Sequence, residues 1–179
     1  VVMIIFAIFN AAIERVAYKP LRHAPRLAPL ITAIGMSFIV QNIGLAIYGV
    51  NYQTVPNFIP RTDVISIGPI SYSWSKASVL IIVIPLLLVL SWFVRSTKQG
   101  KAMRAVSQDT EASAMMGIDV NRTISVTFLL AGALAGAAGI IYLLQFNMRY
   151  DTGFELGLIA FTAAVLGGIG NLSGAVLGA

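Results

Sequence analysis

The sequence predicts an all-α membrane protein, a polytopic bundle of transmembrane helices joined by polar loops, one of which contains a short helix. Composition is the first reason: of 179 residues, 58% are hydrophobic and only 11% are charged, whereas a soluble domain has about 25% charged residues. The second reason is the length of the apolar runs, because a helix needs roughly 20 residues to cross a bilayer. The third is an uneven distribution of Lys and Arg among the loops.

Three apolar runs are long enough to cross a membrane. They cover residues 29–50, 77–94 and 123–144. A further apolar run, 1–13, is too short to cross and begins with neither a Met nor a basic leader, so it does not resemble a signal peptide. Because the chain also ends in an apolar stretch, we expect a fragment truncated at both ends, with residues 1–179 forming a single transmembrane domain.

The positions of the basic residues predict how the chain is oriented. Nine of the 12 Lys and Arg lie in the first and third loops, 14–28 and 95–122, and three lie in the second and fourth loops, 51–76 and 145–155. The positive-inside rule therefore assigns the first and third loops to the cytoplasm. Topology, rather than a nucleic-acid partner, explains the net charge of +5.

The sequence has no motif for catalysis, nucleotide binding or metal binding. The absence of Cys excludes disulfides and thiol catalysis, and without G-x4-G-K-[ST] the chain is not expected to bind ATP. His23 is the only histidine and is expected to be solvated in its basic loop. The predicted spans hold no charged pair of the kind that a proton relay needs. We therefore expect no enzyme activity and no cofactor on this chain.

The first long run carries polar residues on one helical face. Ser37, Gln41, Gly44 and Tyr48 recur at i, i+4, i+7 and i+11, and Asn42 lies beside them. Polar side chains in a span face other helices or a water-filled path, because lipid offers them no hydrogen-bond partner. Two uses remain open, namely hydrogen bonds between helices and the lining of a translocation path.

The second loop contains a possible hairpin. Its sequence VISI-GP-ISYS, residues 64–73, alternates on both sides of Gly68-Pro69, which favours two short strands joined by a turn. Such a loop is either a simple connection or a contact for a soluble partner.

The third long run contains two pairs of small residues four positions apart. Gly132 pairs with Gly136, and Ala135 pairs with Gly139. Small residues at this spacing let helices approach closely in lipid. We predict that both pairs are packing surfaces rather than ligand sites.

The last apolar run is interrupted at Gly167-Gly168 and continues as GGIGNLSGAVLGA. Irregular backbone at membrane depth is tolerated only where protein or a water cavity covers it, and several transporters build substrate sites from broken helices. The glycines therefore predict a broken or re-entrant helix, with a tight turn between two spans as the alternative. The candidate path residues are Ser37, Gln41, Asn42, Gly167, Gly168 and Asn171.

A short helix with both ends marked is predicted in the third loop. Asp109 is the expected N-cap, and Glu111 in the first turn suits the helix dipole. Residues 110–116 form about two turns, Gly117 is a natural C′ residue, and Asp119 is expected to cap the next helix.

An isolated helix of two turns is only marginally stable in water. Its exposed residues are expected to be Ala112, Ala114, Met115 and Met116. They would be more stable in a groove on another protein, which is a common way for an apolar helix face to bind. The alternative is an ordinary loop with solvated charges.

The chain resembles a known family. The stretch GKAMRAVSQDTEASAMMGIDVNR resembles the cytoplasmic loop of bacterial ABC-importer permeases, in particular the high-affinity branched-chain amino acid (Leu/Ile/Val) permease family. Glu111-Ala112-Ser113 with Gly117 is similar to the Glu-Ala-Ala…Gly loop of importer permeases, with Ser113 in place of the second Ala. The stretches ERVAYKPLRHAPRLAPLITAIGMSFIVQNIGLAIYG and AAVLGGIGNLSGAVLGA resemble the family's first half and its Gly-rich later segment.

The resemblance implies that the short helix is a coupling helix, which docks into a cytoplasmic ATP-binding-cassette ATPase subunit that binds ATP and Mg. The implied coupling residues are Asp109, Thr110, Glu111, Ala112, Ser113, Met115, Met116 and Gly117. The other implied partners are a second homologous permease subunit and a periplasmic binding protein, all at the bacterial inner membrane. The implied substrates are leucine, isoleucine and valine, although related permeases carry other amino acids, urea or short amides.

Two other classes of function are alternatives. An ion-coupled secondary transporter would explain broken helices and polar spans, but the capped cytoplasmic helix would have no role in it. A membrane-embedded enzyme or a structural assembly subunit is the other alternative, and the chain lacks the catalytic residues that the enzyme would need.

Overall fold

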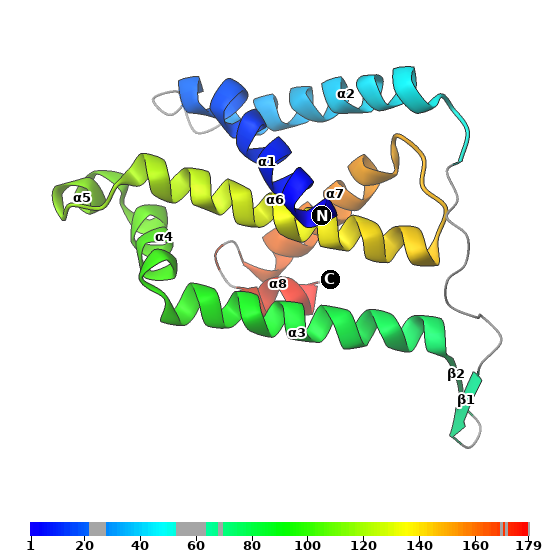
Figure 1. Ribbon diagram of the computed structural model, residues 1–179. Helices are drawn as coiled ribbons and strands as arrows, with labels where there is room; N and C mark the ends of the chain where they lie inside the picture. The colour runs from blue at the N-terminus through cyan, green and yellow to red at the C-terminus, as the bar shows by residue number, and fades with distance from the viewer. Residues whose placement is uncertain (22–27, 53–63, 68–69, 169, 171, 179) are drawn as a thin grey trace. The chain divides into compact units, whose positions relative to one another are not determined.

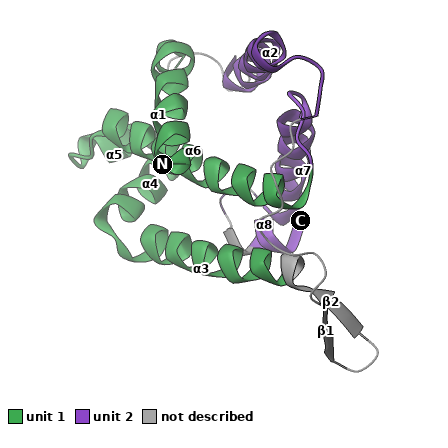
Figure 2. Ribbon diagram, turned by 45° about the vertical axis from the view of Figure 1, so that its right-hand side comes forward, with its two compact units in different colours: residues 1–23, 55–146 green, residues 24–54, 147–179 purple. Residues whose placement is uncertain are grey.

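The structure is a computed structural model that describes residues 1–21, 28–52, 64–67, 70–168, 170 and 172–178 (Figure 1). These residues are almost all helical, which confirms the predicted all-α membrane class. They divide into two compact units, one from the described residues of Val1–His23 and Val55–Phe146 and the other from those of Ala24–Thr54 and Asn147–Ala179 (Figure 2). The single permease domain over residues 1–179 stays a prediction.

Three helices among the described residues are long and apolar enough to cross a membrane. They are α2 (Ala28–Tyr48), α3 (Trp74–Ser96) and α6 (Val120–Gln145), with 21, 23 and 26 residues. At 1.5 Å per residue they measure about 32, 35 and 39 Å, enough for a hydrocarbon core of about 30 Å. The three predicted spans are confirmed.

The first helix extends further than predicted. α1 (Val2–Ile13) runs directly into a π-helix, η1 (Glu14–Tyr18), and then into a 3₁₀ turn, η2 (Lys19–Leu21). The prediction of a polar loop beginning at Glu14 is therefore wrong. The reason is tertiary: Glu14 is 0% exposed, and its carboxylate accepts a hydrogen bond of 2.9 Å from the Ser125 hydroxyl of α6.

α1 packs closely against α6 through the first pair of small residues. A Cβ atom at Gly132 would lie 2.6 Å from both the Asn10 Cβ and the Phe6 carbonyl oxygen, and one at Gly136 would lie 3.0 Å from the Phe6 Cβ. The Asn10 side-chain amide also donates to the Phe128 carbonyl at 2.7 Å. This confirms the packing role predicted for Gly132 and Gly136.

The second pair of small residues is different. Ala135 is exposed, and a Cβ atom at Gly139 would meet no atom within 4 Å. The predicted packing surface is therefore not formed here within the described part of this chain.

Between α3 and α6 the chain forms two shorter helices, α4 (Lys98–Gln108) and α5 (Thr110–Met115). Before α3, strands β1 (Val64–Ile67) and β2 (Ile70–Ser73) pair in antiparallel register, with Val64 opposite Ser73. The predicted hairpin is confirmed in its strands, while Gly68-Pro69 lies outside the described residues.

The second unit contains α2, α7 (Thr152–Gly167) and α8 (Leu172–Gly178). α8 folds back antiparallel onto α7. The two backbones are so close that a Cβ atom at Gly167 would overlap the Gly174 backbone, and one at Gly178 would lie 2.5 Å from the Ala163 carbonyl oxygen. Gly168 ends α7 with φ +90°. The break predicted at Gly167-Gly168 is confirmed, and small residues make the reversal possible.

The α1–α6 contact supplies a first test, in which Gly132→Leu is compared with Gly139→Leu in the same helix. The Gly132 side chain would force apart two backbones that already touch, at a cost of about 1–3 kcal/mol, whereas the Gly139 side chain would enter open space. We expect a lower Tm in detergent for Gly132→Leu alone. Equal Tm values for the two variants would contradict the packing described.

Candidate functional site

A tight corner joins α3 to α4. The Thr97 hydroxyl accepts the Gly100 N–H at 3.0 Å and donates to the Phe93 carbonyl at 2.7 Å. Gly100 is buried, and a Cβ atom there would overlap the backbone of Phe93 and Val94. A side chain at position 100 would therefore displace α4 from the end of α3.

Sequence analysis missed α4, although two signals for it exist. Thr97 is a preferred N-cap residue, and it precedes apolar residues at helical spacing: Ala102, Met103, Ala105 and Val106. All four are partly buried, while Lys98 and Lys101 are exposed. The many charges of the loop concealed this amphipathic pattern.

The N-terminus of α5 is capped as predicted. One carboxylate oxygen of Asp109, Oδ1, accepts hydrogen bonds from the backbone N–H groups of Glu111 and Ala112, both at 2.9 Å. Backbone N–H groups in the first turn of a helix have no carbonyl acceptor within that helix. The cap therefore stabilises a helix that is otherwise too short to be stable alone.

The C-terminus of α5 is a Schellman motif. The Gly117 N–H donates to the Ala114 carbonyl at 3.0 Å, and the Ile118 N–H donates to the Ser113 carbonyl at 3.1 Å. Gly117 has φ +81°, a conformation that glycine adopts at little cost. Asp119 then caps α6 by accepting the Arg122 N–H at 3.0 Å. The predicted caps are confirmed, and they hold α5 in a defined position between two longer helices.

α5 turns a polar residue inward and apolar residues outward. Ser113 is 5% exposed, and its hydroxyl donates to the Asp109 carbonyl at 2.6 Å. Met115 and Met116 are 83% and 82% exposed, and Glu111 and Ala112 are exposed as well. Because Ser113 bonds to its own helix, it fits the position where the family motif has Ala.

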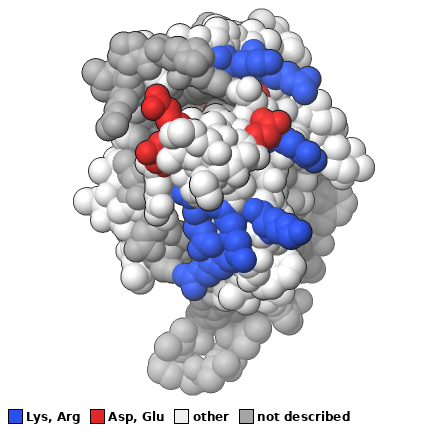
Figure 3. Space-filling view, turned by 90° about the vertical axis from the view of Figure 1, so that its left-hand side faces the viewer, with Lys and Arg blue, Asp and Glu red and all other residues white. Residues whose placement is uncertain are grey.

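Within its unit, α5 is at the tip of the arm formed by α4 and α6 (Figure 1). The view onto this end shows groups of Lys and Arg side chains around a mostly uncharged surface (Figure 3). α5 therefore exposes Met115 and Met116 on a helix capped at both ends with charged side chains around it (Figure 3).

The polar residues of α2 have different surroundings. The Ser37 hydroxyl donates to the Ala33 carbonyl at 2.9 Å, and the exposed Asn42 amide donates to the Phe38 carbonyl at 2.8 Å. Gln41 is partly buried, and among the described residues its Nε2 has no hydrogen-bond partner. An unpaired buried amide is costly, so Gln41 is the residue of this face that most needs a ligand, water or another subunit.

Ser37 also lines a hollow between α2 and α7 in the second unit. Its volume is about 270 Å³, and Gly153 and Gly157 of α7 widen it. Gly167 lies ten residues beyond Gly157, about 15 Å along the helix. The structure therefore does not bring Gly167 and Gly168 to Ser37, and Asn171 and His23 lie outside the described residues.

A charged cluster precedes α7 that sequence analysis did not single out. Arg149 forms an ion pair with Asp151 and donates from Nε to Oδ1 at 2.8 Å. Its guanidinium lies 5.6 Å from the ring centroids of both Tyr52 and Tyr150. The hydrogen bond from Arg149 holds the pKa of Asp151 below its usual range, and the same bond raises the pKa of Arg149. The cluster links the end of α2 to the start of α7.

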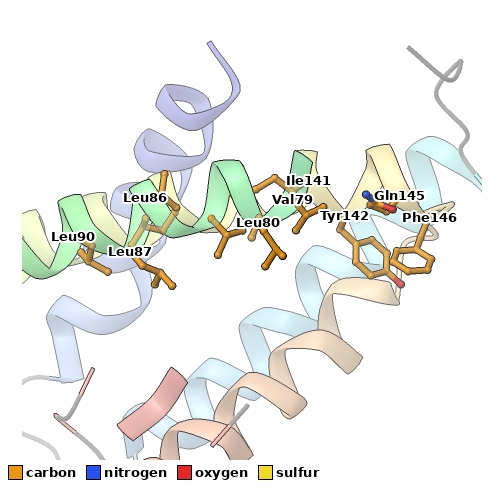
Figure 4. A pocket seen from close by; sticks show the side chains of 12 residues that line it. Val79, Leu80, Leu86, Leu87, Leu90, Ile141, Tyr142, Gln145 and Phe146 are labelled. Carbon is orange, nitrogen blue, oxygen red and sulfur yellow. The ribbon is translucent and has the colours of Figure 1, made fainter. Parts of the chain in front are cut away.

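A hollow of about 590 Å³ lies between α3 and α6 in the first unit. Figure 4 shows leucines of α3 opposite Ile141, Tyr142 and Phe146 of α6. The Tyr142 and Phe146 rings are 5.0 Å apart. This lining is almost wholly apolar, which suits lipid chains or a further helix rather than a zwitterionic solute. The described residues also contain no group of three or more His, Cys, Asp or Glu that is placed to hold a metal ion.

Comparison with protein families decides the class. The family model described as "Branched-chain amino acid transport system / permease component" matches residues 1–179. The chain belongs to this family. The sequence resemblance noted above is thereby confirmed, and three helices long enough to cross a membrane agree with a permease component.

Individual relatives agree with the family. The chain is 36% identical over 180 residues to BraD of Pseudomonas aeruginosa and 36% identical over 181 residues to LivH of Escherichia coli, both named high-affinity branched-chain amino acid transport system permease proteins. These matches cover 98% of the chain but only 59% and 58% of the relatives. LsrC of Klebsiella pneumoniae, named an autoinducer 2 import system permease protein, is 39% identical over 105 residues, 55% of the chain and 30% of LsrC. No solved structure matches the chain significantly.

The caps of α5 generate the second test. Asp109→Ala removes the acceptor for two backbone donors and should cost about 1 kcal/mol of local helix stability. Amide hydrogen exchange in the protein, followed by mass spectrometry of the proteolytic fragment that covers 109–117, should then be about five-fold faster. Asp109→Asn keeps an acceptor oxygen and should exchange like the wild type. Unchanged exchange in Asp109→Ala would mean that the cap does not stabilise α5.

Proposed function

We propose that this chain is part of a membrane-spanning permease subunit of an ATP-binding-cassette importer that translocates branched-chain amino acids. The observation that carries the proposal is α5, a short helix rigidly capped at both ends that exposes Met115 and Met116 between two spans of a branched-chain permease family member. A permease needs no catalytic residues of its own, only a path and a transmitted force.

In this proposal α5 is the coupling helix and docks into a groove of a cytoplasmic ATPase subunit. Its two methionines are flexible and polarizable, which suits them to an apolar groove. ATP and Mg bind to the partner ATPase, whose differential contacts with the nucleotide drive the conformational change. The caps at Asp109 and Gly117 matter because a force passes from one protein to another only through a segment that does not unfold.

The remaining partners follow from the same proposal. A second homologous permease subunit completes the path, a periplasmic binding protein delivers the substrate, and the assembly lies in the bacterial inner membrane. Two loops with nine of the 12 Lys and Arg face the cytoplasm. The substrate class rests on the relatives named for branched-chain amino acids.

The path is proposed to include Ser37 and Gln41 of α2, together with Asn42 and the break at Gly167, Gly168 and Asn171. The support for Gln41 is its unpaired, buried Nε2. The support for Ser37 is the hollow that it lines with apolar residues and two glycines of α7. Asn42 has the weakest support, because its amide bonds to its own helix and is exposed.

The coupling role is tested by Glu111→Lys in the full-length protein. The substitution reverses an exposed charge in the first turn of α5 and is expected to prevent co-purification of the ATPase subunit and to abolish vanadate-sensitive uptake, while membrane insertion is retained. Glu155→Lys makes the same change at an exposed position in α7 and should retain the ATPase. Wild-type uptake by Glu111→Lys would refute the coupling role. A protein that purifies alone and moves solute along an ion gradient would replace the proposal by a secondary transporter.

The path is tested by Gln41→Leu against Asn42→Leu. Removing an unpaired buried amide should leave the Tm unchanged or raise it, so a change in the KM of uptake would reflect contact with the substrate or its water. Asn42→Leu is expected to affect uptake less than Gln41→Leu, because the exposed Asn42 amide already donates to the Phe38 carbonyl of its own helix. Unchanged kinetics in Gln41→Leu would assign Gln41 to packing between helices.

A further inference from the structure

A basic hollow lies where α6 begins, in the first unit. It has a volume of about 280 Å³ and is lined by Arg15, Lys19, Asn121, Arg122 and Ser125. Three of these five residues are cations, and all three are exposed. They come from two segments that are about 100 residues apart in the chain, so only the tertiary structure brings them together.

Contacts between η1 and α6 fix the position of this hollow. The buried Glu14 carboxylate accepts the Ser125 hydroxyl at 2.9 Å, and the rings of Tyr18 and Phe128 lie 5.1 Å apart. These two contacts lie on either side of Arg15 along the chain. Arg15 therefore extends from a backbone segment that is packed against α6, rather than from a mobile loop.

The acidic residues closest in sequence to these cations each accept another hydrogen bond, and for Glu14 the donor is Ser125 at the hollow itself. Glu14 is buried against α6, and Asp119 caps α6 through the Arg122 backbone N–H. Within the described part of the chain, Arg15, Lys19 and Arg122 form no ion pair with either of them. Among the described residues, three cations against one buried carboxylate leave an excess of positive charge at the hollow, which attracts an anion, and a phosphate group accepts hydrogen bonds from several of the cations at once.

The surface beside the cations is apolar. Ile5, Ile8 and Val16 are 57%, 62% and 75% exposed, and they lie on α1 and η1, the helical segment that contains Arg15 and leads to Lys19. Arg122 lies in the first turn of α6, a candidate membrane span. A cationic site at the end of a membrane span, above an exposed apolar face, matches an amphiphile with an anionic head.

We propose that this hollow binds the phosphate-bearing headgroup of an anionic phospholipid, whose acyl chains lie along the exposed face of α1. Basic pockets at the cytoplasmic ends of transmembrane helices bind such headgroups. The α6 side of the site follows α5 by only a few residues in the chain, but the binding itself does not depend on which solute the protein carries.

The experiment is a titration of phosphatidylglycerol into the detergent-solubilised full-length protein, with the bound fraction measured by native mass spectrometry. Phosphatidylcholine serves as the zwitterionic comparison. The wild type should bind phosphatidylglycerol preferentially. Arg122→Gln should weaken phosphatidylglycerol binding about five-fold, as expected for the loss of one charge near a membrane surface. The triple variant Arg15→Gln, Lys19→Gln, Arg122→Gln should bind phosphatidylglycerol no better than phosphatidylcholine.

The matched control is Lys98→Gln with Lys101→Gln, which neutralises exposed cations of α4 outside the hollow. This control should still bind phosphatidylglycerol in preference to phosphatidylcholine. If it loses the preference as fully as the triple variant does, the lipid responds to total charge and the proposed site is overturned. Inorganic phosphate that competes as well as the lipid would indicate a soluble anion and overturn the lipid. Loss of the ATPase subunit from the triple variant, with lipid binding unchanged, would assign the hollow to a protein interface.

Discussion

The first unit depends on the close approach of α1 to α6. In lipid the hydrophobic effect does not drive helices together, so association requires tight van der Waals contact and hydrogen bonds between helices. Gly132 and Gly136 remove the side chains that would keep the backbones apart, and Asn10 adds a hydrogen bond across the contact. Once α1 is seated, Glu14 and Ser125 extend the contact toward the polar end of α6.

That contact also positions the elements proposed to act. α6 carries the basic hollow at its first turn and receives α5 through only a few residues, each restrained by a backbone hydrogen bond or a capping carboxylate. A similarly short connection, Thr97, joins α4 to the end of α3, and the close packing there leaves no room for a side chain at Gly100. If α5 acts as the coupling helix proposed above, these connections would transmit its movement to α6 as the displacement of a rigid segment.

The second unit follows a different packing rule. α8 lies against α7 because glycines at 167, 174 and 178 let two backbones touch, while α2 meets α7 through aromatic rings, with Phe38 and Phe154 5.4 Å apart. Between these contacts a hollow remains at Ser37, next to an amide at Gln41 whose Nε2 is unpaired among the described residues. Polar groups left without partners in a membrane span are costly, and they face either other helices or a water-filled path.

The local features could be predicted from the sequence because their causes are local. The length of an apolar run determines whether a helix can span the bilayer, and Asp109, Gly117 and Asp119 determine helix ends through hydrogen bonds within a few residues. The same holds for the strands on either side of Gly68-Pro69. The helix α4 was missed although Thr97 and its apolar stripe were present, because charge density was taken as the sign of a loop.

The tertiary structure alone decided which of several equivalent patterns is used. Gly132–Gly136 and Ala135–Gly139 have the same spacing, but in the part of the chain that the structure describes only the first pair meets another helix. Glu14 was predicted to be a loop residue, but it is buried. The hydroxyl that donates to it belongs to Ser125, 111 positions away in the chain, so the sequence around Glu14 gives no sign of this contact. The basic hollow likewise joins Arg15 to Arg122. Such contacts depend on the relative positions of distant helices, which spacing along one helix does not encode.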